Sequence, residues 1–257
     1  MVVRHINSRD NPLLKRLKKL AQDSVAYRNL SQVWLEGDHL CGSALSQGVA
    51  PVMAVFSASY WSRAQCQSAY PAVETVVVED QLYAAISPHD SPAPMAFVVD
   101  LPATPGINGL MHTLVLDRVQ DAGNVGSILR SAAAFGVGQV IALKGTAALW
   151  APKVVRAGMG AHFSLHLIEQ ATADDLSALQ LPLVVSSSHQ GEFLQVIKLS
   201  QPCAWVFGHE GQGVSLDLMA RAELSVRIAQ PGGQESLNVA AAAAICLHAS
   251  AIAALNS

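Results

Sequence analysis

Residues 113–136 read TLVLDRVQDAGNVGSILRSAAAFG, and this stretch decides the fold. The apolar run Leu114–Leu116 predicts a short buried strand, and Ser127–Phe135 is expected to form a helix. The polar segment between them, 117–126, predicts a loop in which glycines let the backbone turn tightly. A strand, a loop and a helix in this order form the repeating unit of an α/β sheet.

The same unit recurs through the second half of the chain. Apolar runs predict further strands at Val140–Leu143, Leu165–Ile168, Leu183–Ser186, Ala204–Phe207 and Leu224–Ile228. Strands this apolar, separated by helices, are typical of a parallel sheet covered on both faces. Such sheets bind ligands in the crevice beyond the carboxyl ends of their strands. The residues that follow each strand are therefore the candidates for a binding site.

Three loops that follow strands have unusual compositions. The first, 117–130, holds Asn124 and leads to Arg130. The second is GHEGQG at 208–213, and the third is AQPGGQESLN at 229–238. Each glycine-rich loop alone would be read as a tight turn between a strand and a helix. Together the three loops predict one composite pocket, because glycine lets the backbone approach a ligand closely.

The spacing of these residues excludes several familiar sites. The loop 208–213 lacks the Lys-Ser/Thr ending of a phosphate-binding P-loop, and no GxGxxG opens a helix after the first strand of this half. His209 and Glu210 are not followed by a histidine at zincin spacing, and no GxSxG elbow is present. The nine histidines show no paired metal-ligand spacing, so we expect no metal site.

The chain closes with SLNVAAAAAICLHASAIAAL at 236–255. Twenty apolar-leaning residues suggest a membrane span, but Asn238, His248 and several small polar residues weaken that interpretation. A helix that is apolar all round is buried in a core or an interface. We therefore expect this helix to pack inside the protein or against a second copy, and we expect no membrane association.

The first half of the chain also alternates short apolar runs with helical stretches. Strands are predicted at Val33–Leu35, Val52–Phe56, Val73–Val78 and Ala96–Val99, and helices at about 38–47, 60–69 and 80–86. This alternation favours a second, smaller α/β domain. The segment DLPATPGING at 100–109 is dense in Pro and Gly and indicates a linker. The sequence thus predicts two domains, 1–104 and 105–257.

The charge is unevenly distributed. Seven Lys and Arg residues and two Asp residues give the first 28 positions a charge of +5, although the whole chain carries −3. A basic segment on an acidic body is one feature of proteins that bind polyanions. The alternative is a solvated amphipathic helix, because Leu13, Leu14, Leu17 and Leu20 have helical spacing beside the lysines.

Composition limits the class of protein. With 51% hydrophobic and 14% charged residues, the chain is not expected to be disordered. Four scattered cysteines without a CxxC pair argue against a disulfide scaffold or a zinc knuckle. The first twenty residues carry charges where a signal peptide needs its apolar stretch. These features favour a globular protein of the cytoplasm.

Taken together, the three loops resemble the motifs of the SpoU (TrmH-like) branch of the SPOUT RNA 2′-O-methyltransferases. The first motif is matched by Asn124, Gly126 and Arg130, and the second by Gly208, Glu210, Gly211 and Gly213. The third is matched by Ile228, Gly232, Glu235, Ser236, Leu237 and Asn238, with an alanine-rich helix behind. The third motif usually begins Ile-Pro-Met, whereas this chain has Ile228-Ala229-Gln230.

The first half resembles the substrate-binding module of the same family, which is an L30e-like α/β domain. INSRDNPLLKRLKKL at 6–20 and WLEGDHLCGSAL at 34–45 match its usual run. The resemblance implies a C-terminal parallel sheet tied in a trefoil knot, S-adenosylmethionine as cofactor, a homodimer, and methylation of a ribose 2′-hydroxyl. It also points to ribosomal (23S) RNA as the substrate.

The resemblance also implies roles for individual residues. The catalytic set is Arg130, Asn124, Glu210, Asn238 and Ser236. The cofactor-binding set is Phe207, Gly208, Glu210, Gly211, Gly213, Ile228, Gln230, Ser236 and Leu237. The RNA-binding set is Arg9, Asn11, Lys15, Lys18 and Arg28. Arg130 is the residue expected to activate the 2′-hydroxyl, either as a base or as a cation that orients the RNA and stabilises negative charge.

Three alternatives stay open at this stage. The first is a tRNA ribose methyltransferase of the same family. The second is a non-catalytic L30e-like RNA-binding protein, against which the polar residues of the three motifs argue. The third is a knotted methyltransferase that acts on a base, which the Asn/Arg first motif and the ESLN third motif disfavour.

Overall fold

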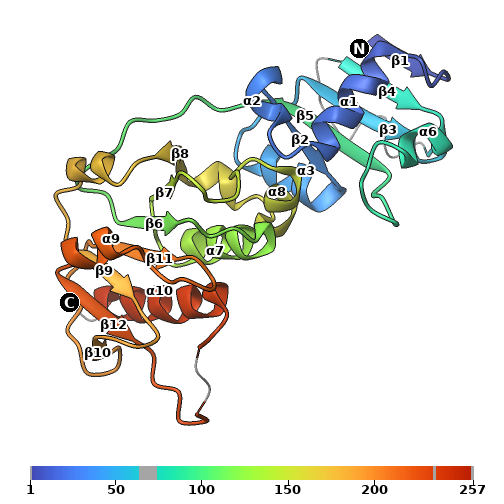
Figure 1. The fold of residues 1–257 in the computed structure, drawn as a ribbon. Coiled ribbons are helices and arrows are strands. Elements are labelled where there is room, and N and C mark those ends of the chain that lie inside the picture. The colour runs from blue at the N-terminus through green and yellow to red at the C-terminus, as the bar shows by residue number, and fades with distance from the viewer. Residues whose placement is uncertain (1, 64–73, 234–235, 256–257) are drawn as a thin grey trace. The chain divides into compact units, whose positions relative to one another are not determined.

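The computed structural model describes residues 2–63, 74–233 and 236–255, and the chain forms two compact units (Figure 1). One unit is Met1–Ala103 together with Trp150–Phe163, and the other is Thr104–Leu149 together with Ser164–Ser257. The expected division into 1–104 and 105–257 therefore differs in one segment. Residues 150–163 group with the first unit because helix α8 (Pro152–Gly158) packs against strand β2 (Gln32–Glu36).

The first unit is built on a mixed five-stranded sheet in the order β1-β4-β3-β5-β2. Its other strands are β1 (Val2–Ile6), β3 (Met53–Ser57), β4 (Glu74–Val78) and β5 (Met95–Asp100). Its other helices are α1 (Pro12–Gln22), α2 (Ala26–Leu30), α3 (Asp38–Ser46), α4 (Ala58–Trp61) and α6 (Asp80–Ala84), with a 3₁₀ turn at Ala161–Ser164 at the unit boundary. The four predicted strands are confirmed, except that Val73 lies outside the described residues. Positions 64–69 of the predicted helix 60–69 also lie outside them.

Helix α1 has one apolar and one basic side. The Asn11 side chain caps its first turn by accepting a hydrogen bond from the Leu13 amide at 2.9 Å. Leu14, Leu17 and Leu20 are buried, whereas the lysines and Arg16 are exposed. The expected amphipathic helix is confirmed, and its basic side faces solvent.

The second unit is built on a seven-stranded sheet in the order β10-β12-β9-β11-β6-β7-β8, in which every described pairing is parallel. Its strands are β6 (Thr113–Asp117), β7 (Gln139–Leu143), β8 (His166–Ala171), β9 (Leu183–Ser186), β10 (Glu192–Phe193), β11 (Ala204–Gly208) and β12 (Leu224–Arg227). Its helices are α7 (Ala122–Ala134), α9 (Leu216–Arg221) and α10 (Val239–Leu255), with a 3₁₀ turn at Asp174–Ala178. The predicted parallel α/β sheet is confirmed, and its central strands are fully buried.

Helix α7 begins five residues earlier than the sequence predicts. The Asp121 side chain accepts a hydrogen bond from the Asn124 amide at 2.7 Å, which caps the helix at Ala122. Gly126 is buried in the helix and does not form a turn. Asn124 therefore projects from the first turn of a helix and not from a loop, which fixes its position relative to the sheet.

Helix α10 is held by a buried hydroxyl. Ser250 Oγ accepts hydrogen bonds from the Trp205 indole and the Gln201 amide, both at 2.8 Å. Trp205 is completely buried, so this bond ties the helix to strand β11. The helix also packs against α7. Within the described residues, no helix combines the length and apolar character needed to cross a membrane.

Candidate active site

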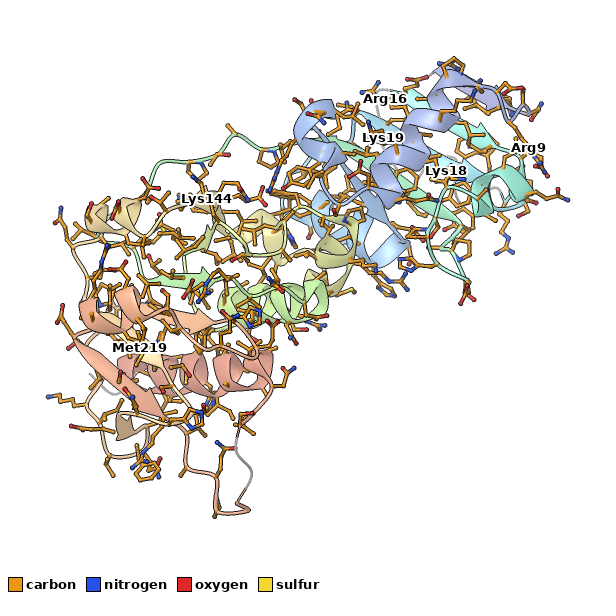
Figure 2. All side chains as sticks on the ribbon, viewed as in Figure 1. Arg9, Arg16, Lys18, Lys19, Lys144 and Met219 are labelled. Atoms are coloured by element: carbon orange, nitrogen blue, oxygen red, sulfur yellow. The ribbon has the colours of Figure 1, made fainter. Side chains whose placement is uncertain are left out.

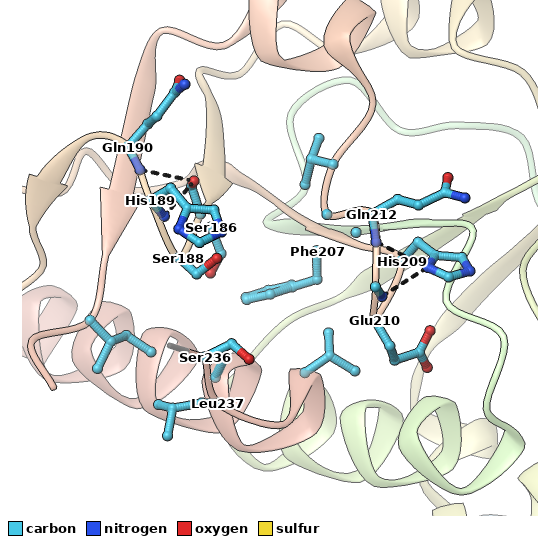
Figure 3. A pocket seen from close by; sticks show the side chains of 18 of the residues that line it. Ser186, Ser188, His189, Gln190, Phe207, His209, Glu210, Gln212, Ser236 and Leu237 are labelled. Carbon is cyan, nitrogen blue, oxygen red and sulfur yellow. Dashed lines mark hydrogen bonds between the residues drawn. The ribbon is translucent and has the colours of Figure 1, made fainter. Parts of the chain in front are cut away.

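A cavity of about 730 Å³ lies in the second unit beyond the carboxyl ends of β9, β11 and β12 (Figure 3). Four segments line it: Ser186–Gln190, the loop Phe207–Val214, Leu216 and Met219 of α9, and residues from Ile228 into α10. Figure 3 shows Ser186 to Gln190 on one side of the cavity and His209 to Gln212 on the other. The position is the one that a parallel sheet favours for a ligand.

The loop after β11 folds back on itself. The backbone of His209 and Gly213 exchanges two hydrogen bonds, at 3.1 and 2.8 Å. His209 Nδ1 accepts a further bond from the Gly211 amide at 2.9 Å. A Cβ atom on Gly208 would overlap the backbone of Gly213 and Val214, so only glycine fits there. The loop therefore presents its backbone to the cavity in a fixed shape.

Glu210 joins this loop to the start of α7. Its carboxylate accepts hydrogen bonds from the backbone amides of Gln120 and Asp121, at 3.2 and 3.1 Å, and from the Asn124 side chain at 3.1 Å. Burial raises the pKa of Glu210, but these bonds outweigh it and hold the pKa below its ordinary value. The carboxylate is therefore ionised at neutral pH.

Asn124 links Glu210 to the third motif through a hydrogen bond with Asn238. Its Oδ1 accepts a hydrogen bond from the Asn238 side chain at 2.9 Å. Asn238 Oδ1 in turn accepts from the amides of Ala240 and Ala241, so the same residue caps α10. One chain of hydrogen bonds thus links Glu210, Asn124 and Asn238, which lie far apart in the sequence.

A second set of hydrogen bonds, which the sequence analysis missed, holds the loop after β11 to the end of β6. Asp117 is 2% exposed and accepts hydrogen bonds from the Ser215 amide at 2.6 Å and from Arg118 Nε at 2.9 Å. Arg118 Nη1 also donates to Gln212 Oε1 at 3.0 Å. The hydrogen bond to Asp117 raises the pKa of Arg118. A carboxylate at the end of a buried strand is the signal that could have identified this pair.

The structure places all nine residues of the expected cofactor set on the wall of this one cavity: Phe207, Gly208, Glu210, Gly211, Gly213, Ile228, Gln230, Ser236 and Leu237. Glu235 of the third motif lies outside the described residues. Sequence analysis missed Ser187–Gln190, although this polar run directly follows the predicted strand Leu183–Ser186. Applying the strand-end rule to β9 would have found it.

The expected catalytic set is only partly brought together. Glu210, Ser236 and Asn238 line the cavity, and Asn124 is bonded to two of them. Arg130 does not line it. It lies exposed on α7, and no hydrogen bond or ion pair joins it to another residue in the described part of the chain. Its guanidinium is therefore available to a partner from outside.

The expected RNA-binding set lies in the first unit, on and around α1 and α2. Asn11 is engaged as the cap of α1. The Arg28 guanidinium lies 5.4 Å from the centre of the Tyr27 ring and its Nε donates to the Tyr27 hydroxyl. Arg9, Lys15 and Lys18 are exposed, and Figure 2 labels Arg9 and Lys18 on this unit. Arg28 is exposed as well, so all four charged side chains of the set present positive charge to solvent.

The comparisons with known proteins agree with the geometry. A model of the SpoU rRNA Methylase family matches residues 111–248, which is more than half of the chain. The chain belongs to the SpoU rRNA methylase family. The match covers all three motifs, so the resemblance seen in the sequence is confirmed.

Relatives of the family match over nearly the whole chain. The 23S rRNA (guanosine(2553)-2′-O)-methyltransferase RlmP of Bacillus subtilis is 27% identical over 255 residues, covering 96% of this chain and 98% of that protein. A solved TrmH-family protein from Porphyromonas gingivalis, described as an RNA methyltransferase, is 30% identical with a TM-score of 0.80, covering 95% and 98%. The AdoMet-bound rRNA methyltransferase of Sinorhizobium meliloti is 26% identical with a TM-score of 0.82, covering 96% and 97%.

The cavity fits the family's cofactor, S-adenosylmethionine. Its volume lies in the range of about 300–1,000 Å³ that is usual for small-molecule sites. Gln230 lines it, and the buried Gln230 Oε1 has no hydrogen-bond partner among the described residues. A buried acceptor of this kind needs a donor, which a nucleoside with an exocyclic amine supplies. No group of three or more His, Cys, Asp or Glu in the described part of the chain could hold a metal ion.

Replacing Gly208 tests whether the loop after β11 forms the cofactor site. We expect Gly208→Ala to weaken S-adenosylmethionine binding at least about tenfold, because a Cβ there collides with the backbone of Gly213 and Val214. Gly106→Ala is the matched control, since Gly106 belongs to the same unit, does not line the cavity and has no atom within 4 Å of a Cβ built there. Isothermal titration measures both. Equal affinities in the two variants would show that the loop does not contact the cofactor.

The lowered pKa of Glu210 predicts a pH dependence. A depressed folded-state pKa stabilises the protein above the ordinary carboxyl pKa, and this contribution is lost as the pH falls through the folded value. We expect Glu210→Gln to lower the melting temperature between about pH 6 and 8, with the difference shrinking as the pH falls below the ordinary carboxyl pKa and disappearing below the folded value. Glu223→Gln, an exposed carboxylate of the same unit, is the control. A constant difference down to the lowest pH would contradict this role of the charge.

Proposed function

We propose that this chain transfers the methyl group of S-adenosylmethionine to the 2′-hydroxyl of a ribose in ribosomal RNA, with 23S RNA as the substrate. The observation that carries this function is the cavity whose walls hold the second and third motifs, connected to the first by Glu210, Asn124 and Asn238. The family membership supports it, as do relatives named as rRNA 2′-O-methyltransferases.

The residues of this chain have to hold the cofactor and orient the ribose. Bound S-adenosylmethionine would supply an already activated methyl group; the 2′-oxygen would attack it in line as the S–CH3 bond breaks, S-adenosylhomocysteine would leave, and the hydroxyl proton would pass to solvent. The backbone of 208–213 and the segment around Gln230 hold the cofactor. The hydrogen bonds from Asn124 and Asn238 fix the first turns of α7 and α10 against that wall.

Arg130 acts on the RNA and not on the cofactor. A guanidinium keeps its proton at neutral pH and does not serve as a base there. As a permanent cation it orients an RNA phosphate and stabilises the negative charge that develops on the 2′-oxygen. Its exposed position on α7, without a partner in the described part of the chain, supports this role.

We also propose the trefoil knot of the second unit and the L30e-like fold of the first unit. The second unit forms the trefoil knot of the family, supported by the family match over 111–248 and by the parallel seven-stranded sheet. The first unit is an L30e-like module that binds the RNA, supported by its mixed α/β sheet and by the basic side of α1.

The protein acts as a homodimer in this proposal. Ile245, Ile252 and Leu255 of α10 are 41%, 44% and 81% exposed, and their spacing places them along one side of the helix. Apolar side chains exposed along one side of a helix favour a partner surface. Light scattering at micromolar concentration is expected to give twice the chain mass of 27.0 kDa. A mass of one chain would refute the dimer.

Removing the Arg130 side chain tests its role. We expect Arg130→Ala to lower methyl transfer by about 100-fold or more, because one stabilising charge at the reacting oxygen is lost. Affinity for S-adenosylmethionine is expected to change less than about twofold, since Arg130 does not line the cavity. The measurement is radiolabelled methyl transfer to ribosomal RNA from cells that lack this gene. Arg156→Ala, an exposed arginine of α8, is the control, and normal turnover of Arg130→Ala would remove Arg130 from the mechanism.

Salt separates the two binding functions. We expect RNA affinity to fall steeply between about 50 and 200 mM salt, because the lysines and arginines release counterions from the RNA. S-adenosylmethionine affinity is expected to stay nearly constant, since no Lys or Arg lines the cavity of the second unit. Titrations of both ligands over the same salt series provide the measurement. If RNA and S-adenosylmethionine affinity depended on salt to the same extent, the proposal that the basic residues bind only the RNA would be contradicted.

A further inference from the structure

A second, smaller cavity of about 250 Å³ lies within the first unit, between α1 and the segment that begins with α6. Cationic side chains stand at its rim, and apolar side chains form its floor. The lining residues are Arg9, Leu14, Lys15, Lys18, Gln81, Leu82, Ala85 and Ile86. Nothing in the methyl-transfer site uses this cavity.

The cavity has a fixed floor. Leu14 and Leu82 are 7% exposed and Ile86 is 1% exposed, so the floor belongs to the core of the unit. Gln22 Nε2 donates to the carbonyl oxygens of Ala85 and Ile86, at 3.2 and 3.0 Å. These two bonds fasten the segment after α6 to the end of α1, which holds the cavity open.

The cationic side chains at the rim are free to bind a phosphate group. Arg9 and Lys18 make no hydrogen bond or ion pair with another residue in the described ranges, and both are exposed. Lys15 meets only Asp10, at 3.3 Å, and both side chains are exposed, so this pair is weak. The two acidic groups at the start of α6 are engaged: Glu79 caps the helix by accepting from the Leu82 amide, and Asp80 accepts from the Ser59 amide. The rim therefore carries net positive charge.

Helix α1 has two basic edges, and only one of them borders the cavity. Lys15 and Lys18 lie on the edge toward α6, whereas Arg16 and Lys19 lie on the other, where Arg16 donates to Gln32 at 2.7 Å. Figure 2 labels Arg9 and Lys18 toward the α6 side and Arg16 and Lys19 away from it. The two edges carry the same formal charge but differ in what lies beside them.

We propose that this cavity binds one unpaired nucleotide of the RNA substrate, with its phosphate among Arg9, Lys15 and Lys18 and its base on the apolar floor. This rests on the proposed function only in taking RNA as the ligand. Cations bind phosphates, an apolar floor accepts the face of a base, and Gln81 offers an amide to the base edge. A helical RNA cannot insert a base in this way, so the site selects single-stranded or looped RNA.

The charge test compares the two edges of α1 in the full-length protein. The probe is fluorescein-labelled decauridylate, and a duplex of the same length serves for comparison. We expect Lys15→Ala combined with Lys18→Ala to weaken binding of the single strand at least about fivefold and to lower the salt slope by about 1.4, as for two lost phosphate contacts. Arg16→Ala combined with Lys19→Ala removes the same charge and is expected to change affinity less than about twofold.

A second test fills the cavity without changing any charged residue. Ala85→Phe fills the cavity, whereas Ala84→Phe adds the same ring at the neighbouring exposed position, which does not line it. We expect Ala85→Phe to weaken decauridylate binding at least about fivefold with an unchanged salt slope, and Ala84→Phe to have little effect. Gln81→Trp is a second occluding variant should Ala85→Phe lower the melting temperature.

The outcomes separate this site from the proposed function. Equal losses from the two double variants, or equal binding by the two phenylalanine variants, would overturn the nucleotide site and leave a diffuse basic surface. Methyl transfer to ribosomal RNA by the wild-type protein would still stand in that case. Conversely, a wild-type protein that binds decauridylate through this cavity but transfers no methyl group would overturn the function and keep the site. Methyl chemical shifts of Leu14, Leu82 and Ile86 that move with uridine 5′-monophosphate but not with inorganic phosphate would place the base on the floor.

Discussion

The ionised carboxylate of Glu210 is the interaction on which the active-site geometry depends. It accepts three hydrogen bonds from the segment around the start of α7, two of them from backbone amides that no helix or strand partner satisfies. A neutral amide at this position would turn its NH2 group toward at least one of these donors, so the three bonds together need both oxygens of a carboxylate. Through Asn124 the same contact reaches Asn238 and the first turn of α10. Three segments that lie far apart in the sequence are thereby held together beside the cavity.

Much of this could be predicted from the sequence, because two elementary patterns carry the information. Apolar runs identify buried strands, and parallel strands end at one edge of a sheet, so the loops after β11 and β12 had to meet. The predicted start of α7 was wrong. Gly123 and Gly126 suggested a loop, but the Asp121 side chain caps the helix at Ala122 and the helix includes both glycines. Strand β1 was missed because Arg4 and His5 interrupt its apolar pattern. Asp117 and Arg118 were missed because their contact with Ser215 and Gln212 crosses about a hundred positions of sequence, which no local pattern encodes.

Under the proposed function, the two units contribute to RNA binding in different ways. The second unit offers backbone groups, amides and one exposed arginine, and the wall of its large cavity carries no Lys or Arg. The first unit concentrates positive charge on one helix whose other side is anchored by leucines. The amphipathic and the polyanion-binding interpretations of this segment are therefore compatible, because burial of Leu14 and Leu17 is what orients the basic side chains outward.

The grouping of residues 150–163 with the first unit has a consequence for how the protein is made. The chain leaves the first unit at Ala103, returns at Trp150, and leaves again after Phe163. Val154, Val155 and His162 from this return are buried, so the core of the first unit lacks a part until they have been synthesised. The amino-terminal unit therefore cannot complete its folding as it emerges from the ribosome. Its core is completed only about sixty residues later, when β6, α7 and β7 of the second unit have already been synthesised, so folding of the first unit overlaps the start of the second.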